Sequence, residues 1–451
     1  MSAKLKFLLP LLLCLIIFPA HTMIKTGFQA PVYDARGYIH QSEELKVFPK
    51  EIEAGNTIIF PPFYPGFLKF FSSNNSDLKE ALNCYKLDGN NCNIKELWPI
   101  YTAQMLMLAV GIYLIFLGLY FLTGQYGLSL FAMILVLGFG KLNVYGTWLI
   151  TEAMVFTFFF AFMAAYCYIL TRDAKIWHYM LMGVAIAGAA LTRPSYMYLI
   201  YALVPFLPFY MVAVRKLRPR DAIKNTAAFI LSICIIIGPW ILRNYYYYDF
   251  ASVSVGYGSY ILSERVAYNE MTWTEWAVSF IYWLPDFGDK LASALFSEEF
   301  YQRLNFESPT GFYLIGNTEF RNEIYSLAST EAERRAILLN DYIFQDLFKH
   351  IMVTFTMVCR GMWTGKYFGL VGFVFLVPGI LILRHRVRFA TLCAFAVPFY
   401  FMLGLNAFVS VSIPRYNMPM QMFYALFIAA VFYYAVSKKW RQSLTSGTQD
   451  H

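Results

Sequence analysis

Long apolar runs, separated by short polar and basic stretches, are the dominant pattern of the chain. A helix needs roughly 17–25 mainly apolar residues to cross the hydrocarbon core of a bilayer. About ten runs approach this length, within a range of about 10–12 that depends on how adjoining runs are divided. The pattern therefore predicts an all-α polytopic membrane protein. The predicted transmembrane helices are residues 5–22, 100–122, 127–146, 150–171, 176–193, 196–214, 225–242, 368–383, 388–408 and 416–436.

Two long segments, 23–99 and 243–350, lack such runs and are predicted to form two extracytoplasmic loop regions. They divide the chain into an N-terminal transmembrane module (1–242) with the first loop (23–99), a second loop with an adjoining helix (243–367) and a C-terminal transmembrane module (368–451). In the second loop, SVSVGYGSY is typical of strands and turns. A polar helical run is predicted to begin at Thr330, with Glu333 completing a capping box.

Basic clusters between the runs predict the orientation. With ten spans, all five clusters fall on one side, which the positive-inside rule assigns to the cytoplasm. An eleventh span at 347–363 would move one cluster to the other side. We therefore expect an interfacial helix there, with Lys349, Arg360 and Trp363 at the headgroup level. The clusters are KLK (4–6), RDAK (172–175), RKLRPR (215–220), RHRVR (384–388) and KKWR (438–441).

The first apolar run has two interpretations. Its basic start and apolar core match a cleavable signal peptide. The sequence that follows, FPAHT, lacks the small-x-small pattern of a cleavage site. We therefore expect an uncleaved first transmembrane helix.

Composition excludes several classes of protein. The chain is 59% hydrophobic and 14% charged, whereas soluble globular proteins have about 25% charged residues. The net charge of +8 lies in orientation-type clusters, so nucleic-acid binding is not expected. The six histidines are scattered, and TGKYFG lacks the upstream glycine spacing of a phosphate-binding loop. We expect no metal and no cofactor.

Two cysteines, Cys84 and Cys92, lie in the first loop region. In an oxidising compartment they either form a disulfide, with a contribution of about 2–3 kcal/mol, or remain free thiols. The sequence leaves both alternatives open. The other five cysteines lie in or near the apolar runs and are expected to be packing residues.

Ionisable residues at the ends of spans are costly unless they pair or face a cavity. The predicted topology places several at the outer membrane face. Arginine suits phosphate binding because its planar guanidinium donates two hydrogen bonds at once. A lone arginine at a helix end is also commonly a snorkelling side chain or half of an ion pair, and Glu152 either pairs with one of these arginines or supports the site. The outer set is Asp34, Arg36, Glu152, Arg193, Arg243 and Arg415.

Asp34 has two interpretations. It fits the N-cap of a helix that begins at ARGYIHQSEEL. It also fits a general base, because transfer of a sugar from a lipid phosphate needs no acid at the leaving group. One carboxylate that deprotonates the incoming hydroxyl or amine is sufficient.

These motifs together resemble the GT-C-fold glycosyltransferases that use lipid-phosphate sugars, in the protein O-mannosyltransferase and aminoarabinose transferase branch. The resemblance covers most of the chain. In order, the motifs are D-x-R-x-Y after the first span, PPFYPGF, TEAMVF, GAALTRPSYMY, GPWILRNYYYYDF and PRYNMP.

The resemblance implies a GT-C-like fold, a polyprenyl-phosphate sugar donor and inversion at the sugar, with Asp34 as the base. Many relatives have a second acidic residue where this chain has Ala35, which argues against protein O-mannosylation in particular. Many also have a basic residue where this chain has Phe60. By position, the donor-phosphate contacts implied are Arg36, Tyr38, Tyr64 and Arg243, together with Arg193 and Arg415.

The expected function is therefore an integral-membrane glycosyltransferase of a bacterial inner membrane, with its site on the periplasmic side. Its partners are membrane lipids, the lipid-linked sugar and a glycolipid, polysaccharide or protein acceptor. One alternative is a transporter or flippase of a lipid-linked saccharide. Transporters usually carry ionisable residues near the bilayer midplane and often show inverted repeats. A second alternative is a non-catalytic subunit of polysaccharide assembly.

Overall fold

The computed structural model describes residues 3–31, 33–45, 59–87 and 92–437. Within these ranges the chain is α-helical and has no β-strand. The strand-like turns expected at SVSVGYGSY cover only its first part, which bends and forms one isolated antiparallel bridge between Ile59 and Val255. The second part enters helix α11 (Tyr257–Val266). Gly256 supplies the left-handed backbone (φ 74°) from which this helix begins.

Six helices in the described part of the chain are long and apolar enough to cross a membrane. They coincide with six of the predicted spans, and the protein is a multi-pass, all-α membrane protein. The six are α1 (Ala3–Lys25), α5 (Trp98–Thr123), α7 (Glu152–Thr171), α9 (Tyr196–Ala213), α10 (Pro219–Tyr248) and α21 (Phe389–Val409).

The other four predicted spans are helical but shorter than predicted. Helix α6 (Tyr126–Phe139) ends where Lys141 adopts a left-handed conformation. The span predicted at 368–383 is divided into α19 (Tyr367–Val374) and α20 (Leu376–Leu383). Pro378 has no N–H to bond to the carbonyl of Val374, so one continuous helix is disfavoured there. The remaining two are α8 (Ile176–Ala190) and α22 (Met420–Val436).

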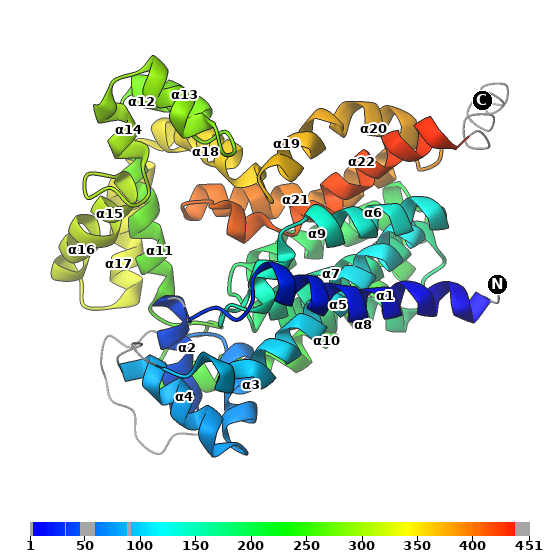
Figure 1. The fold of residues 1–451 in the computed structure, drawn as a ribbon, viewed down its shortest axis with the longest axis horizontal. Helices are drawn as coiled ribbons and strands as arrows, with labels where there is room; N and C mark the ends of the chain where they lie inside the picture. Colours follow the sequence, from blue (N-terminus) through cyan, green and yellow to red (C-terminus); the bar gives the residue numbers. More distant parts are fainter. Residues whose placement is uncertain (1–2, 32, 46–58, 88–91, 438–451) are drawn as a thin grey trace.

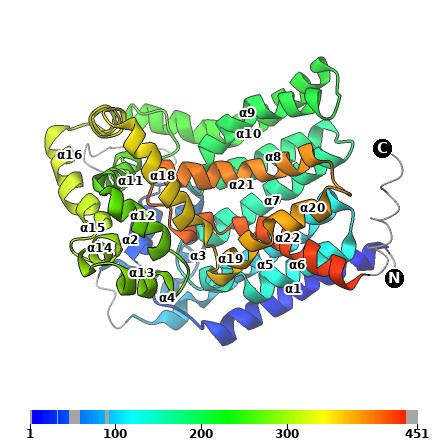
Figure 2. The same ribbon diagram turned by 90° about the horizontal axis from the view of Figure 1, so that it is seen from above.

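Figure 1 shows these helices side by side in one bundle. The start of α1 and the end of α22 lie at one end. The helices of both long loop regions gather at the opposite end, called the loop end below. Seen from above in Figure 2, α9 and α10 form one edge of the bundle and α1 lies at the opposite edge.

The loop end is built from short helices. The first loop region contributes α2 (Tyr33–Glu44), α3 (Phe63–Ser72) and α4 (Ser76–Leu87). In the second, Thr330 forms the predicted capping box, with its hydroxyl accepting from the Glu333 amide at 3.2 Å. Besides α11, the second loop region contains α12 (Trp273–Tyr282), α13 (Gly288–Leu295), α14 (Glu298–Leu304), α15 (Phe312–Ile315), α16 (Arg321–Leu327), α17 (Glu331–Ile337) and α18 (Leu347–Met362).

Helix α18 occupies the segment predicted as an interfacial helix, but two of its expected headgroup residues lie elsewhere. Arg360 and Trp363 are buried in the protein. Arg360 donates to the Tyr268 hydroxyl at 3.0 Å and lies over the Trp283 ring at 5.0 Å. Lys349, in contrast, lies over the ring of Trp273 at 4.1 Å. Aromatic rings of the second loop region therefore hold the Arg360 cation that we expected among lipid headgroups.

A fully buried arginine links the second loop region to the bundle. Arg265 of α11 donates to the carbonyl oxygen of Ala407 at 2.8 Å and to that of His350 at 3.1 Å. These partners belong to α21 and α18. Its guanidinium also donates to Asn269 Oδ1 and Thr354 Oγ1, at 3.1 and 3.0 Å. Loss of the two carbonyl partners would leave a buried charge only partly satisfied, which is destabilising. Arg265 therefore fixes the position of α11 over the end of the bundle.

Candidate active site

Asp34 lies in the first turn of α2, at the loop end. Its side chain is 50% exposed, and its Oδ2 accepts from Arg415 Nη2 at 2.8 Å. Because α2 begins at Tyr33, Asp34 is already inside the helix and is not its N-cap. A carboxylate in the first turn is stabilised by the helix dipole. The cap interpretation is thus replaced by an ion pair to a residue 381 positions away in the sequence.

Glu152 joins this pair to a second arginine. It begins α7, is 1% exposed, and places Oε1 3.2 Å from Arg415 Nε and 3.5 Å from Arg193 Nη1. The Arg415 contact has ion-pair distance without hydrogen-bond alignment. Asp34, Arg415, Glu152 and Arg193 therefore form one connected network, called the acid–arginine network below. Its two carboxylates and two guanidinium groups balance in charge.

Local sequence explains how the two arginines reach this place. Helix α8 ends at Ala190, and Pro194 disfavours a helical conformation at Arg193. Pro414 opens a short 3₁₀ helix, η6 (Pro414–Asn417), between α21 and α22. Each arginine therefore projects from a tight connection at the loop end. In both cases a proline lies within the connection that follows the preceding long helix.

Aromatic rings line the network. The Arg193 guanidinium lies 4.3 Å from the centre of the Tyr416 ring, and that of Arg415 lies 5.4 Å from it. Tyr38 shares a face of α2 with Asp34, since residues four apart are neighbours on a helix. Burial, followed by the negative charges of Glu152 and Asp34, raises the pKa of the Tyr38 hydroxyl well above its usual value. Tyr38 is therefore a neutral hydrogen-bonding group beside Asp34.

Three residues expected at the site lie outside the acid–arginine network. Arg36 is two positions from Asp34 on α2 and is exposed. Residues two apart on a helix point in different directions. Arg243 of α10 is buried among its own neighbours, 4.4 Å over the Trp240 ring and 2.8 Å from Asn244 Oδ1. Tyr64 is fully buried behind Tyr38, and its hydroxyl donates to Gln104 at 2.7 Å.

The sequence interpretation missed Glu264. This α11 side chain is 3% exposed and lies within electrostatic range of Asp34. Burial, with a smaller contribution from the Asp34 charge, raises the pKa of its carboxyl to about 8, against the opposing effects of Tyr313 and Arg321. The acidic residue of YILSERV was the available signal. Only the packing of α11 brings it near α2, so the local sequence did not distinguish it from a surface glutamate.

The raised pKa of Glu264 predicts a pH-dependent stability. The ordinary pKa is 4.5, so between pH 4.5 and about 8 the folded protein keeps a proton that the unfolded chain has lost. The free energy of unfolding should therefore fall as pH rises through this window, by up to about 1.4 kcal/mol per unit, and this contribution should be flat above it. Thermal unfolding in detergent at pH 5.5 and 7.5 measures this decline. Glu264→Gln should reduce it, and an unchanged decline would contradict the assignment.

Cys84 and Cys92 form a disulfide across a sequence separation of 8, between the end of α4 and the segment before α5. The chain-entropy account gives about 2–3 kcal/mol for so short a loop. We expect the double variant Cys84→Ser/Cys92→Ser to lose about this much stability in thermal unfolding. Cys234→Ser, which removes an exposed free cysteine, is the control and should unfold like wild type. Equal unfolding of all three proteins would contradict the prediction.

An apolar cavity of about 580 Å³ adjoins the network. Arg193, Tyr257 and Tyr416 line it at the network side. It continues between α9, α10, α11 and the end of α21, past Tyr201 and Ile261. Tyr201 is 61% exposed on the outer side of α9. The cavity therefore connects a cationic site at the loop end with the lipid-facing edge of the bundle.

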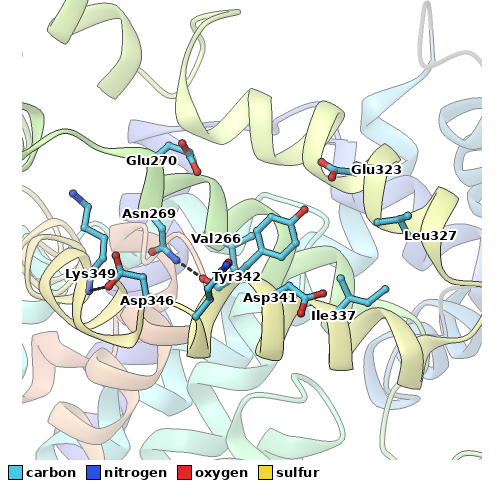
Figure 3. Close-up of a pocket in the computed structure, with 11 residues that line it drawn as sticks. Val266, Asn269, Glu270, Glu323, Leu327, Ile337, Asp341, Tyr342, Asp346 and Lys349 are labelled. Carbon is cyan, nitrogen blue, oxygen red and sulfur yellow. Dashed lines mark hydrogen bonds between the residues drawn. The ribbon is translucent and has the colours of Figure 1, made fainter.

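A second cavity, of about 500 Å³, lies in the second loop region (Figure 3). Its lining comes mainly from α16, the end of α17, the π-helical turn η5 (Leu338–Phe344) and the 3₁₀ helix η3 (Ala267–Glu270). None of these elements carries a residue of the acid–arginine network. Within the cavity the Asn269 amide donates to the Tyr342 carbonyl at 3.2 Å. Among the described residues, no group of three or more His, Cys, Asp or Glu side chains is arranged to hold a metal ion. The acidic side chains of this cavity are Glu270, Glu323, Asp341 and Asp346.

No profile of a known protein family matches the chain, and no curated protein is significantly similar to it.

Proposed function

We propose that the protein is an integral-membrane glycosyltransferase of GT-C type, which moves a sugar from a polyprenyl-phosphate donor to an acceptor at the outer membrane face. The observation that carries the proposal is the position of Asp34. Its half-exposed carboxylate is held by Arg415 beside a cavity with apolar walls and Arg193 at one end. The proposed base, the proposed phosphate-binding arginine and the apolar cavity thus adjoin one another.

The cavity fits the donor in two respects. Its apolar lining suits an isoprenoid chain, and its exposed side on α9 gives that chain a route from the bilayer. Arg193 both pairs with Glu152 and lines the cavity. One arginine–phosphate contact at 4 Å is worth about 4 kcal/mol at an effective dielectric near 20, before desolvation costs. The lipid phosphate would therefore bind at the network end of the cavity.

The reaction uses Asp34 as general base. Asp34 removes the proton from the acceptor hydroxyl or amine while that atom attacks the anomeric carbon of the sugar. The bond between this carbon and the phosphate oxygen breaks on the opposite face, so the configuration inverts. The electron pair leaves with polyprenyl phosphate, and the positive charges of Arg193 and Arg415 stabilise the charge that develops there. The leaving phosphate needs no proton, which agrees with a single carboxylate acting as base.

Topology supports the outward site. Each of the ten predicted spans falls on helical structure, and ten crossings would bring both loop regions to one side of the membrane. That side is the periplasmic face of a bacterial inner membrane, if the basic clusters mark the cytoplasm. Ala35 is fully buried beside Asp34, so a second acidic residue has no exposed place there. This argues against protein O-mannosylation in particular, and the acceptor is a glycolipid, a polysaccharide or a protein.

The test is a transfer assay with the full-length protein in proteoliposomes. The vesicles receive a panel of polyprenyl-phosphate sugars and an acceptor extract, and released polyprenyl phosphate is measured. We expect release with at least one donor, and a strong reduction in Ile261→Trp, which fills the cavity. Leu295→Trp, at an exposed position of α13, is the matched control. Movement of the intact donor across the bilayer without release would instead identify a transporter.

A further inference from the structure

A second group of cations lies at the ends of α1, α6 and α19. Figure 2 shows these helices on the other side of the bundle from α9 and α10. Lys25 is the last residue of α1, Lys141 follows α6, and Lys366 precedes α19. The group is distinct from the acid–arginine network. It also lies away from the apolar cavity, which opens along α9 and α10.

Packing brings the three lysines together. The Gln421 side-chain amide donates to the Gly140 carbonyl. A Cβ at Gly365 would be 3.0 Å from Gln421 Nε2 and 3.5 Å from the Gly140 carbonyl oxygen. The connections that carry Lys141 and Lys366 therefore abut. Lys141 also lies within electrostatic range of Lys25.

The backbone in this region is held in an unusual conformation. Six described residues other than glycine have positive φ, and three of them belong here: Lys141 (54°), Asp286 (63°) and Lys366 (60°). A left-handed conformation costs a residue with a side chain roughly 1–2 kcal/mol compared with the right-handed one. Asp286 forms an ion pair with Lys366 and lies within electrostatic range of Lys141. The strain is therefore concentrated at residues that share one charged cluster.

The charges of the cluster do not balance. Lys25, Lys141 and Lys366 supply three positive charges, and Asp286 supplies one negative charge. Two positive charges remain. Like charges in proximity destabilise one another, and an anion bound between them would relieve this repulsion.

Buried polar groups in the same connections point to a ligand. Thr364 Oγ1 and Asn143 Nδ2 lie next to the lysine-bearing turns, and both residues are at most 3% exposed. Both atoms, like Gln421 Oε1, are among the ten buried side-chain atoms of the described residues that have no hydrogen-bond partner. A hydroxyl and an amide N–H are both donors to anionic oxygen atoms. Buried donors usually have partners, so an anion bound at the turns would accept from Thr364 Oγ1 and Asn143 Nδ2. Gln421 Oε1 is itself an acceptor and would not be satisfied by an anion.

We infer that Lys25, Lys141 and Lys366 form a binding site for a phosphate group, separate from the acid–arginine network. Each of the three residues lies at the loop end of an apolar helix: α1, α6 or α19. A phosphorylated lipid headgroup at the membrane surface would meet them there. An ammonium group binds phosphate as a point charge and tolerates several geometries. The site therefore recognises the phosphate and not the rest of the lipid. The inference does not depend on the transfer reaction.

The experiment uses the full-length protein in nanodiscs of phosphatidylcholine, with and without phosphatidic acid, and in a third arm inorganic phosphate. Thermal unfolding and binding of fluorescent phosphatidic acid are measured. We expect stabilisation by phosphatidic acid, and binding about 30-fold weaker in Lys141→Gln/Lys366→Gln, since each lysine near a membrane surface contributes about a factor of five. Stabilisation by inorganic phosphate to the same extent would support the site and identify a soluble ligand.

Lys216→Gln is the matched control. Lys216 also has positive φ, at 59°, but lies between α9 and α10 at the other end of the bundle. This variant should weaken phosphatidic acid binding by no more than about five-fold, the general effect of one lysine near a membrane surface, well short of the double variant. The single variant Lys25→Gln, at an exposed position, tests the site if the double variant does not fold. Equal binding by wild type, Lys25→Gln and the double variant would overturn the inference, as would no stabilisation by either phosphate source.

Discussion

Asp34→Asn should lower the rate of sugar transfer by about 10²- to 10⁴-fold, the usual contribution of a positioned general base. Asparagine has the same shape but cannot accept the proton of the acceptor. It can still accept a hydrogen bond from Arg415, which in wild type donates to Asp34 at 2.8 Å. Donor binding should therefore change little. The measurement is kcat from polyprenyl phosphate release, together with donor affinity from the quenching of a fluorescent analogue.

Arg36→Gln is the control for this variant. Arg36 lies on the same helix, two positions from Asp34, and faces a different direction. It should keep most of the wild-type rate, although the sequence motif D-x-R-x-Y contains both residues. If Asp34→Asn turned over like wild type, the base would be another residue. If Arg36→Gln lost as much activity as Asp34→Asn, the loss would come from a disturbance of α2 as a whole. It would then not identify Asp34 as the base.

The fold class was predictable because its signal is compositional and repeats along the chain. An apolar run of sufficient length specifies a helix and a place in the membrane. The ends of the helices were less predictable. Helix α6 stops at Phe139, just before Lys141, and the span after Lys366 is broken near Pro378 although that segment remains apolar. Backbone conformation and a missing N–H decide these ends, and hydropathy reports neither.

The candidate site was predictable where topology alone decides it. An even number of crossings between Asp34, Glu152, Arg193 and Arg415 brings all four to one end, and the structure connects them. Which arginine meets which carboxylate depends on tight turns and helix faces. That is why Arg36 points away, and why Arg243 instead lies against Trp240 and Asn244. The lysine cluster depends on backbone angles and went unnoticed in the sequence.

The two carboxylates of the acid–arginine network differ in their exposure to solvent. Asp34 is half exposed, whereas the Glu152 side chain is 2% exposed. Of the two carboxylates, Asp34 can therefore meet an acceptor, and Glu152 can only position the arginines. Glu152 is a positioning residue in this account, and its removal should affect stability as well as turnover.

Glu152→Gln should lower the free energy of unfolding by about 3–5 kcal/mol, the usual cost of removing one partner of a buried ion pair. Arg193 and Arg415 both approach Glu152 Oε1, at 3.5 and 3.2 Å. Without this carboxylate, two guanidinium groups with side chains 17% and 22% exposed share the single negative charge of Asp34, which among the described residues pairs with Arg415 only. Thermal or denaturant unfolding in detergent measures the loss.

The double variant Glu152→Gln/Arg193→Gln separates charge from packing. Removing one guanidinium together with the carboxylate leaves a single cation near Asp34, so part of the lost stability should return. A positive coupling in this double-mutant cycle identifies the Glu152–Arg193 interaction as electrostatic. Additive losses would contradict this assignment. Transfer should remain impaired in the double variant even where stability recovers, because Arg193 is then absent from the phosphate end of the cavity.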